Sequence, residues 1–406
     1  MKILQISPQV PFPLSDGGKV GIFNLTKYIA LRGHDITLVA LDVHGPADVR
    51  PLLEFCDLIA IPHSNKNSVP GAIRNLLSDI PYNISKYQSD PLEQRLRTLL
   101  ARESFEVVHI DHLHMARYGL LCRELAGMPI VLREHNVESV IMERFRSVAK
   151  SRVLRYWLES QLARIRRYEA EMAGTFDACC MITARDEEVI RSLQPRARTY
   201  VIPAGVEGRY FVKPRRMRKI PNSIALVGDF EWGPSKDALD WFVKGILPKI
   251  LAMAPKLQVH LIGKNIPEAM SRMGRQIVVR GLVQDFKEEL QQYEMLAVPL
   301  RVGGGIRLKI LESFAMGVPV VSTSIGCEGI DAAHEKHLLI ADTEEEFAKQ
   351  TLRLADDPRL KNKLIRDAQV FVRRNYRWED IGKSLERVYK DVITAKTGRG
   401  RKAKKP

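Results

Sequence analysis

A glycine-rich turn that leads into a short charged helix is the part of this sequence with the clearest chemistry. Residues 303–324 are GGGIRLKILESFAMGVPVVSTS, and the apolar spacing predicts a helix over about 306–316, followed by a buried strand. Free N–H groups and the positive end of the helix dipole make such a helix start an anion site. Glycines also let a phosphate approach the backbone with no Cβ in the way. The sequence therefore predicts a phosphate-binding turn here.

Three charged side chains beside this turn fit a nucleoside diphosphate. Lys309 and Glu312 are three residues apart and so share one helix face, while the long side chain of Arg307 can reach back over the turn. Two cations near backbone amides would neutralise a diphosphate, and an acid one turn further along can accept hydrogen bonds from two ribose hydroxyls. The alternative interpretation is a plain turn followed by an exposed Lys–Glu pair.

Apolar runs of strand and helix type alternate along most of the 406 residues, which is typical of an α/β fold. Runs such as KILQIS, VVHID and SIALVGD are continuously apolar, as expected for strands buried on both faces of a parallel sheet. The pattern restarts after the basic segment 207–222. We therefore expect two Rossmann-like domains, 1–206 and 207–375, with parallel sheets facing across a cleft and the ligand at the carboxyl ends of the strands.

The net charge of +15 is concentrated in three places, residues 208–219, residues 141–173 and the tail from Lys396 to Lys405. Such patches suit nucleic acid, anionic lipid headgroups or anionic substrates. Little aromatic interleaving argues against a nucleic-acid partner. The pattern in 141–173 fits either an amphipathic helix in peripheral contact with an anionic membrane or a helix packed on its own domain with a basic outer face.

Several classes of protein are disfavoured by what the sequence lacks. No apolar run approaches the roughly 18 to 20 residues that span a bilayer, and Met1 leads directly into a predicted strand, so we expect no signal peptide. The five cysteines form no C-x-x-C, which favours a reduced, cytoplasmic chain without structural zinc. No G-x-G-x-x-G follows the first strand, against a nicotinamide dehydrogenase.

The glycine-rich stretch resembles the sugar-nucleotide motif of retaining glycosyltransferases with the GT-B fold, in particular glycosyltransferase family 4. That motif has the form E-x7-E with a glycine-rich turn between the acids, followed by A-M-A-x-G-x-P-V-V, and ESFAMGVPVVST follows its second half closely. Glu312 matches the second acid, which in the family holds the ribose. The first acid, which contacts the donor sugar, falls on Gly304. Some members carry G-G-G-x-R-x-K-x-L-E, in which Arg307 and Lys309 would supply the charge for the phosphates.

The resemblance extends over nearly the whole chain. SPQVPFPLSDGGKVG corresponds to the N-terminal loop whose glycines, here Gly17 and Gly18, lie beside the donor phosphates and the acceptor. VLREHNVES corresponds to the segment whose histidine, here His135, faces the transferred sugar, and VVRGLVQD to the segment that contacts the base, here through Arg280 and Val283. NYRWEDIGKSLERVY resembles the terminal helix that crosses back to the N-terminal domain. We expect this helix over 376–395 and a disordered basic tail over 396–406.

The resemblance implies a retaining transfer of a sugar from a nucleoside-diphosphate sugar to a hydroxyl acceptor that is lipid-linked or a polysaccharide. It implies no cofactor and no metal, and strand alternation should place His109, Asp111, His112 and His114 of VVHIDHLHMA on different faces. The expected location is the cytoplasm, with contact at the inner face of the membrane. The implied catalytic residues are His135, Arg307 and Lys309, and the implied nucleotide-sugar site is Gly17, Gly18, Arg280, Val283, Gly303, Gly304, Gly305, Ile306 and Glu312.

Two other functions stay open at this stage. A sugar-nucleotide 2-epimerase has the same overall fold but needs several carboxylates in the cleft, which the sequence does not locate. A catalytically silent sugar-nucleotide-binding protein is suggested by the departures from the family pattern at Gly304, Asp229 and Ala204.

Overall fold

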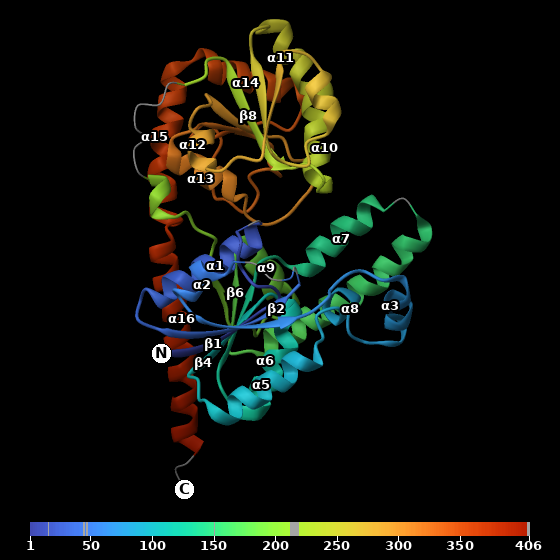
Figure 1. The fold of residues 1–406 in the computed structure, drawn as a ribbon, viewed down its shortest axis with the longest axis vertical. Helices are drawn as coiled ribbons and strands as arrows, with labels where there is room; N and C mark the ends of the chain where they lie inside the picture. Colours follow the sequence, from blue (N-terminus) through green and yellow to red (C-terminus); the bar gives the residue numbers. More distant parts are fainter. Residues whose placement is uncertain (15, 44, 46–47, 150, 212–218, 404–406) are drawn as a thin grey trace. The chain divides into compact units, whose positions relative to one another are not determined.

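The chain folds into two compact units, which a computed structural model describes except at residues 15, 44, 46–47, 150, 212–218 and 404–406 (Figure 1). Unit 1 comprises Met1–Ala204 and Trp378–Pro406, and unit 2 comprises Gly205–Arg377. The domain limits expected from the sequence lie within two residues of these bounds. Most of the basic segment 208–219 lies outside the described residues.

Unit 1 is built on a sheet of seven parallel strands in the order β3-β2-β1-β4-β5-β6-β7. Strands β1, β2, β4 and β5 are buried along nearly their whole length, as their continuous apolar runs predicted. In register, Leu4 of β1 lies beside Thr37 of β2 and Val108 of β4. The strands are β1 (Lys2–Ser7), β2 (Asp35–Asp42), β3 (Asp57–Pro62), β4 (Val107–Asp111), β5 (Ile130–Glu134), β6 (Ala178–Met181) and β7 (Thr199–Val201).

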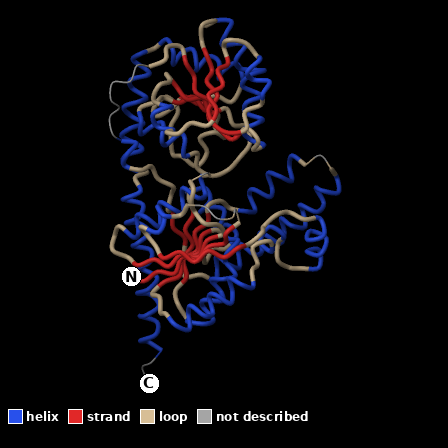
Figure 2. The backbone as a smooth tube through the Cα atoms, in the orientation of Figure 1, coloured by secondary structure: helices blue, strands red, loops and turns tan. Residues whose placement is uncertain are grey.

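Helices surround this sheet (Figure 2). The first of them begins at Gly17 and not after the two glycines, because Asp16 caps it, with Oδ1 accepting the N–H of Lys19 at 2.9 Å. The helical segments are α1 (Gly17–Ala30), α2 (Arg50–Leu53), α3 (Val69–Arg74), the 3₁₀ turn η1 (Asn75–Leu77), α4 (Tyr82–Ser85), α5 (Asp90–Arg102), the 3₁₀ turn η2 (Leu113–Met115), α6 (Ala116–Ala126), α7 (Glu138–Val148), α8 (Arg152–Thr175) and α9 (Ala184–Leu193).

Unit 2 repeats this architecture with six parallel strands in the order β10-β9-β8-β11-β12-β13. They are β8 (Ser223–Asp229), β9 (Gln258–Lys264), β10 (Ile277–Gly281), β11 (Met295–Val298), β12 (Val320–Ser322) and β13 (Leu339–Ile340). The helical segments are η3 (Gly208–Phe211), α10 (Gly233–Trp241), the π-helical turn η4 (Phe242–Ile246), α11 (Leu247–Met253), η5 (Glu268–Arg272), α12 (Phe286–Leu290), α13 (Leu308–Met316), α14 (Glu344–Asp356) and α15 (Pro358–Asn375). The π-helical turn η4 separates α10 from α11 close to Pro248, which lacks a backbone N–H.

The chain ends in helix α16 (Trp378–Ala403), which packs on α1 of unit 1. Trp378 is fully buried and stacks on Tyr28, with the ring centroids 6.5 Å apart. The helix continues past residue 395 to Ala403, so the expectation of a disordered tail over 396–406 is wrong for most of that segment. A docked helix extends readily because each added residue gains a hydrogen bond without the cost of a new nucleus. Residues 404–406 lie outside the described part.

None of the helices in the described part of the chain combines the length and the apolar composition that crossing a bilayer requires.

The docking of α16 depends on Glu386, which is buried and bound to Arg32, His34 and Lys390. Hydrogen bonds from Lys390 and Arg32 lower the pKa of this carboxyl from 4.5 to about 2. A carboxyl with a lowered pKa stabilises the fold above its unfolded pKa, and this contribution is lost as the pH falls toward 2.

We predict that Glu386→Gln lowers the free energy of unfolding by roughly 1.5–3 kcal/mol near neutral pH, because charge-assisted hydrogen bonds are lost. The difference from the unsubstituted protein should shrink as the pH is lowered from 4.5 toward 2 in thermal unfolding curves. Asp380→Asn is the matched control on α16, since Asp380 pairs with Lys383 at the surface. Equal effects of the two substitutions would contradict the assignment.

Candidate functional site

The glycine-rich turn lies between β11 and α13, at the carboxyl end of a central strand of unit 2. Gly303 has φ 140° and Gly305 has φ 74°, conformations that residues with a Cβ rarely adopt. A Cβ on Gly303 would also lie 2.4 Å from Nη2 of Arg307. Gly304 is not among the residues with positive φ, so its backbone could accept a side chain. Glycine is thus required by conformation at two of the three positions.

Helix α13 begins at Leu308, two residues later than expected, because Arg307 has an extended backbone and occupies the N-cap position. The buried side chain of Arg307 does reach back over the turn. Its Nη1 donates hydrogen bonds to the carbonyl of Gly304 and, at 2.9 Å, to that of Gly305. Arg307 therefore holds the turn in shape through these two carbonyls.

Lys309 and Glu312 share a face of α13, as the spacing predicted, and both are partly buried. Nζ of Lys309 donates to the carbonyl of Val227 near the end of β8 at 2.5 Å. Burial and the nearby Arg307 lower the pKa of Lys309 to about 8. Burial raises the pKa of Glu312 to about 7, although a hydrogen bond from Tyr210 acts in the opposite direction. A desolvated cation and a desolvated acid thus lie one helical turn apart.

The loop after β8 also approaches the glycine-rich turn, through a side chain that the sequence analysis did not identify. Trp232 is half exposed, and its ring lies 3.9 Å from the position that a Cβ on Gly303 would occupy. Asp229, the last residue of β8, accepts a hydrogen bond from Asn265 at 2.9 Å. Lys236 is exposed on α10. No sequence motif marks Trp232, since its neighbour at the turn is some 70 residues away.

The two residues expected at the base differ in their surroundings. Arg280 on edge strand β10 forms a two-pronged ion pair with Glu289, with Nε and Nη2 at 2.8 and 3.3 Å from the carboxylate oxygens. Its guanidinium is therefore already bound to an acid of α12. Val283 packs against the same apolar cluster as Ile306, which follows the glycine-rich turn. Val283 and Ile306 thus pack against one apolar cluster, whereas the guanidinium of Arg280 is bound to Glu289.

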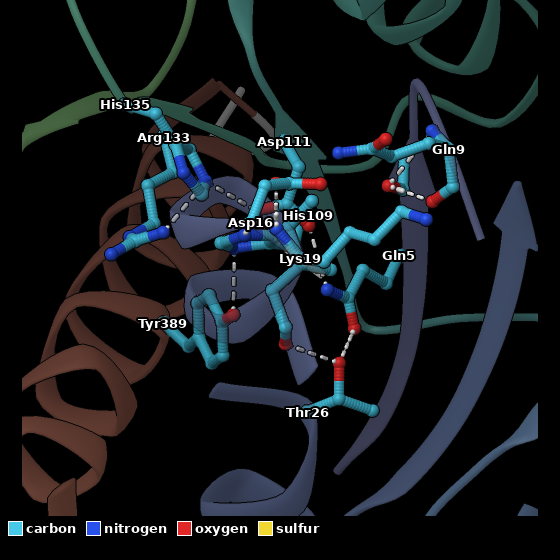
Figure 3. A network of polar contacts seen from close by, with 12 residues as sticks. Gln5, Gln9, Asp16, Lys19, Thr26, His109, Asp111, Arg133, His135 and Tyr389 are labelled. Carbon is cyan, nitrogen blue, oxygen red and sulfur yellow. Dashed lines mark hydrogen bonds and ion pairs between the residues drawn. The ribbon is translucent and has the colours of Figure 1, made fainter. Parts of the chain in front are cut away.

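His135 follows directly after β5 in unit 1 and is buried in a polar network (Figure 3). Nη1 of Arg133 donates to Nε2 of His135 at 2.7 Å, and Oδ1 of Asp111 lies 3.3 Å from the same nitrogen. The imidazole stacks on that of His112, with centroids 3.9 Å apart and planes at 14°. It also lies against α1, where a Cβ on Gly21 would be 3.2 Å from its Cε1. Two polar contacts, a stacked ring and the backbone of α1 therefore fix the position of the His135 imidazole.

Asp111 is the centre of this network and is fully buried. Its Oδ2 accepts a hydrogen bond from Gln5 at 2.7 Å, and Nε2 of His109 lies 3.2 Å from Oδ1. Nδ1 of His109 is in turn 2.8 Å from the hydroxyl of Tyr389 on α16. Figure 3 shows the tyrosine entering the network from the terminal helix. The end of the chain therefore contributes a side chain to the surroundings of His135.

The expectation that strand alternation would separate the residues of VVHIDHLHMA is wrong. His109 and Asp111 are two apart on β4 and so point to the same face. His112 has φ 66°, beyond the end of the strand, and its ring stacks on His135. The two-residue spacing was the signal that could have identified His109 and Asp111 as neighbours.

The charges in this network favour a neutral His135 beside an ionised Asp111. Burial and the charge of Arg133 lower the pKa of His135 to about 4. Burial alone would raise the pKa of Asp111, but the charge of His109 and its hydrogen bond lower it well below its usual range. Since Nε2 of His135 accepts from a guanidinium, we assign its proton to Nδ1. A neutral imidazole can donate or accept a hydrogen bond without adding a charge.

Gly17 and Gly18 form the first turn of α1, so their N–H groups lie at a helix N-terminus. A Cβ on Gly18 would be 3.2 Å from Oδ1 of Asp16 and 3.9 Å from Nε2 of His112. The structure therefore brings Gly18 close to His112, whose ring stacks on His135. Gly18 and His135 had been placed from the sequence by resemblance alone.

Among the residues that the structure describes, no three His, Cys, Asp or Glu side chains are grouped as metal ligands would be.

Comparison with known proteins gives the same division of the chain. Residues 15–210 match the family model of Glycosyltransferase Family 4, and residues 221–357 match that of Glycosyl transferases group 1. A protein of the cps region of Klebsiella pneumoniae is 20% identical over 404 residues, which cover 96% of this chain and 99% of that protein.

Two solved structures show the same fold at low sequence identity. HepE of Anabaena, solved in complex with UDP, has a TM-score of 0.70 at 13% identity and covers 96% of this chain and 100% of its own. WaaG, a glycosyltransferase involved in lipopolysaccharide biosynthesis, has a TM-score of 0.67 at 14% identity and covers 94% of this chain and 98% of its own. HepE has also been solved in complex with UDP-glucose.

The backbone conformation of the glycine-rich turn predicts that alanine destabilises the fold more at Gly303 than at Gly304. Gly303→Ala should lower the free energy of unfolding by roughly 1–2 kcal/mol or more, because it combines a strained φ with a clash against Arg307. Gly304→Ala is the matched control and should stay within roughly 0.5 kcal/mol. Chemical denaturation of both variants measures the difference, and a larger loss for Gly304→Ala would contradict this geometry.

Proposed function

Since this chain is a glycosyltransferase with the GT-B fold, we propose that it transfers a hexose-type sugar from a nucleoside diphosphate to a hydroxyl acceptor with retention of the anomeric configuration. The proposed acceptor is lipid-linked or a polysaccharide, and the reaction serves polysaccharide or glycoconjugate synthesis. The relative in a cps region and the involvement of WaaG in lipopolysaccharide biosynthesis support this choice. The donor is a substrate, and the proposed reaction uses no cofactor.

The observation that carries the proposal is that Lys309 and Glu312 lie on one face of α13, next to the turn held by Arg307. A diphosphate at the start of α13 would accept hydrogen bonds from the first N–H groups of the helix and face the Lys309 ammonium. Glu312, one turn further along, would accept from the ribose hydroxyls. Displacing the hydrogen bond between Lys309 and the Val227 carbonyl would turn the ammonium toward the phosphates. Trp232 is exposed at the same turn and would cover the bound donor.

The chemistry then needs little more than charge and position. As the bond from the anomeric carbon to the phosphate oxygen breaks, negative charge grows on the diphosphate, where α13 and Lys309 stabilise it. The acceptor oxygen forms its bond to the anomeric carbon on the same face, and its proton passes to the leaving phosphate oxygen. Unit 1 would contribute His135, whose neutral imidazole hydrogen-bonds a hydroxyl of the sugar, and the N–H groups at Gly17 and Gly18.

We further propose a cytoplasmic location at the inner face of the membrane. All five cysteines are free thiols in buried positions, and no two of them are joined. Burial raises the pKa values of Cys122 and Cys180 to about 12, which keeps them protonated and unreactive. Free thiols in every cysteine position suit a reducing compartment.

We predict that one substitution weakens nucleotide binding and that another weakens sugar transfer. Glu312→Ala should weaken the binding of UDP, the nucleotide bound to HepE, at least ten-fold, about 1.4 kcal/mol, in calorimetry. His135→Ala should leave UDP affinity nearly unchanged and cut sugar transfer from UDP-glucose or whichever donor a nucleotide-sugar panel selects. Glu345→Ala, an exposed acid of unit 2, is the control. Tight UDP binding with no transfer to any acceptor would favour the silent binding protein instead.

Nucleotide affinity should fall on the alkaline side of neutrality. Lys309 has a pKa of about 8 and so loses its charge as the pH rises through that value, which removes a cation from the phosphates. Affinity for UDP should drop roughly ten-fold for each pH unit above the pKa, because only the protonated form attracts the anion. Lys309→Arg stays charged and should remove this dependence. An unchanged alkaline profile in that variant would exclude Lys309 as its cause.

A further inference from the structure

A buried tyrosine of unit 2 contacts the acid that the proposed function assigns to the ribose. Tyr210 lies in η3 and is only 7% exposed. Its ring packs in the apolar cluster that also contains Leu311 and Phe314 of α13. Its hydroxyl donates a hydrogen bond to the carboxylate of Glu312 on the same helix. The packing of the ring against α13 thus directs the hydroxyl at this carboxylate.

The segment that carries Tyr210 is anchored to unit 2 on both sides of the tyrosine. On one side, Nζ of Lys287 on α12 donates to the carbonyl of Arg209 at 2.6 Å. On the other side, the guanidinium of Arg373 on α15 lies over the ring of Phe211, 5.5 Å from its centroid. The position of Tyr210 on α13 therefore does not depend on the packing of its own ring alone.

A second hydrogen bond fixes the direction in which the Tyr210 hydroxyl donates. The guanidinium of Arg209 donates to the oxygen of this hydroxyl, and a guanidinium has no acceptor to offer in return. The proton of the hydroxyl is therefore left for the carboxylate of Glu312. Arg209 is itself held by Glu207, with Nε 2.9 Å from Oε2. Hydrogen bonds that run in one direction along such a chain strengthen one another.

The hydrogen bond from Tyr210 prepares Glu312 for ribose hydroxyls in two ways. An ionised carboxylate has about four acceptor positions, so one donor leaves room for two hydroxyls of the ribose. Burial raises the pKa of Glu312 to about 7, and the hydrogen bond from Tyr210 lowers it, which favours the ionised form. Arg209 and Glu207 of the same segment and Lys309 of α13 also face this acid. Tyr210 thus directs the carboxylate and keeps more of it in the form that accepts hydrogen bonds best.

We propose that Tyr210 is a positioning residue that holds Glu312 ready for the two ribose hydroxyls, and that it thereby makes unit 2 select nucleotides that carry a ribose. The inference rests on the proposed function, in which Glu312 accepts hydrogen bonds from the ribose. Tyr210 acts through Glu312 and does not itself contact the nucleotide, because its ring is buried in the apolar cluster.

The test is calorimetry on the full-length protein near neutral pH with UDP, ADP and GDP and with their 2′,3′-dideoxy forms. The readout is the ribose preference, defined as the dissociation constant of the dideoxy form divided by that of the ribose form. The unsubstituted protein should show a preference of roughly ten-fold or more, because hydrogen bonds to a charged acceptor are strong. Tyr210→Phe should reduce it to about three-fold or less by weakening the binding of the ribose form alone. Glu312→Ala should abolish it, and adding Tyr210→Phe to that variant should change nothing further.

The pH dependence of the ribose preference separates positioning from structural damage. Titration of the diphosphate and of Lys309 affects both nucleotide forms alike and cancels in the ratio. The preference should fall as the pH decreases through about 7, because Glu312 then gains a proton. Tyr210→Phe removes a donor that lowers this pKa, so the fall should shift to higher pH. Part of the lost preference should therefore return when the pH is raised, which a damaged site would not show.

Tyr376→Phe is the matched control. It removes a buried hydroxyl from the same apolar cluster, one that accepts from the N–H of Asp331 at 3.4 Å, and it should leave the ribose preference unchanged. The inference alone is overturned if Tyr210→Phe leaves the preference unchanged or weakens the binding of both forms equally. Failure of the unsubstituted protein to bind any of these nucleotides would instead overturn the proposed function, and this inference with it.

Discussion

The constraint on which both units depend is that every paired strand in their sheets runs parallel to its neighbours. Parallel strands need crossover connections, so the carboxyl ends of all strands gather at one edge and the loops there are free to vary. In unit 2 this edge carries the glycine-rich turn after β11 and the loop after β8. In unit 1 it carries His112 and His135, which follow β4 and β5. Sequence-distant loops therefore become neighbours without any special contact between them.

The buried ionisable groups at the two edges differ in the protonation state that their surroundings favour. Around Asp111, the carboxylate is surrounded by donors and kept ionised, and the neighbouring His135 is kept neutral. Around α13, the cation of Lys309 and the acid of Glu312 are both shifted toward their neutral forms by burial. The first arrangement fixes a geometry, because the carboxylate of Asp111 contacts Gln5, His109 and His135 at once. The second is ready to gain from an anionic ligand, because a nearby anion would raise the pKa of Lys309.

Helix α16 gives the C-terminal segment a part in the site as well as in the fold. Its first residue, Trp378, fills a buried position on α1, and Glu386 ties the helix to Arg32. One turn further on, Tyr389 reaches His109 across 280 residues of sequence. The helix that completes unit 1 thus also completes the polar network that orients His135. The packing of unit 1 and the positioning of His135 therefore both depend on the docking of α16.

The sequence by itself determined the α/β class, two Rossmann-like units, the glycine-rich turn before a helix and the shared face of Lys309 and Glu312. All of these rest on local patterns, namely continuous apolar strands, glycines before a helix and a three-residue spacing. Only the tertiary structure decided that Asp111 joins His109, His135 and Tyr389, that Trp232 borders Gly303, and that Arg280 is held by Glu289. These side chains meet through strand order and helix docking, which bring together residues with no common local pattern. The start of α1 at Gly17 and that of α13 at Leu308 also depended on capping by Asp16 and on the extended backbone of Arg307.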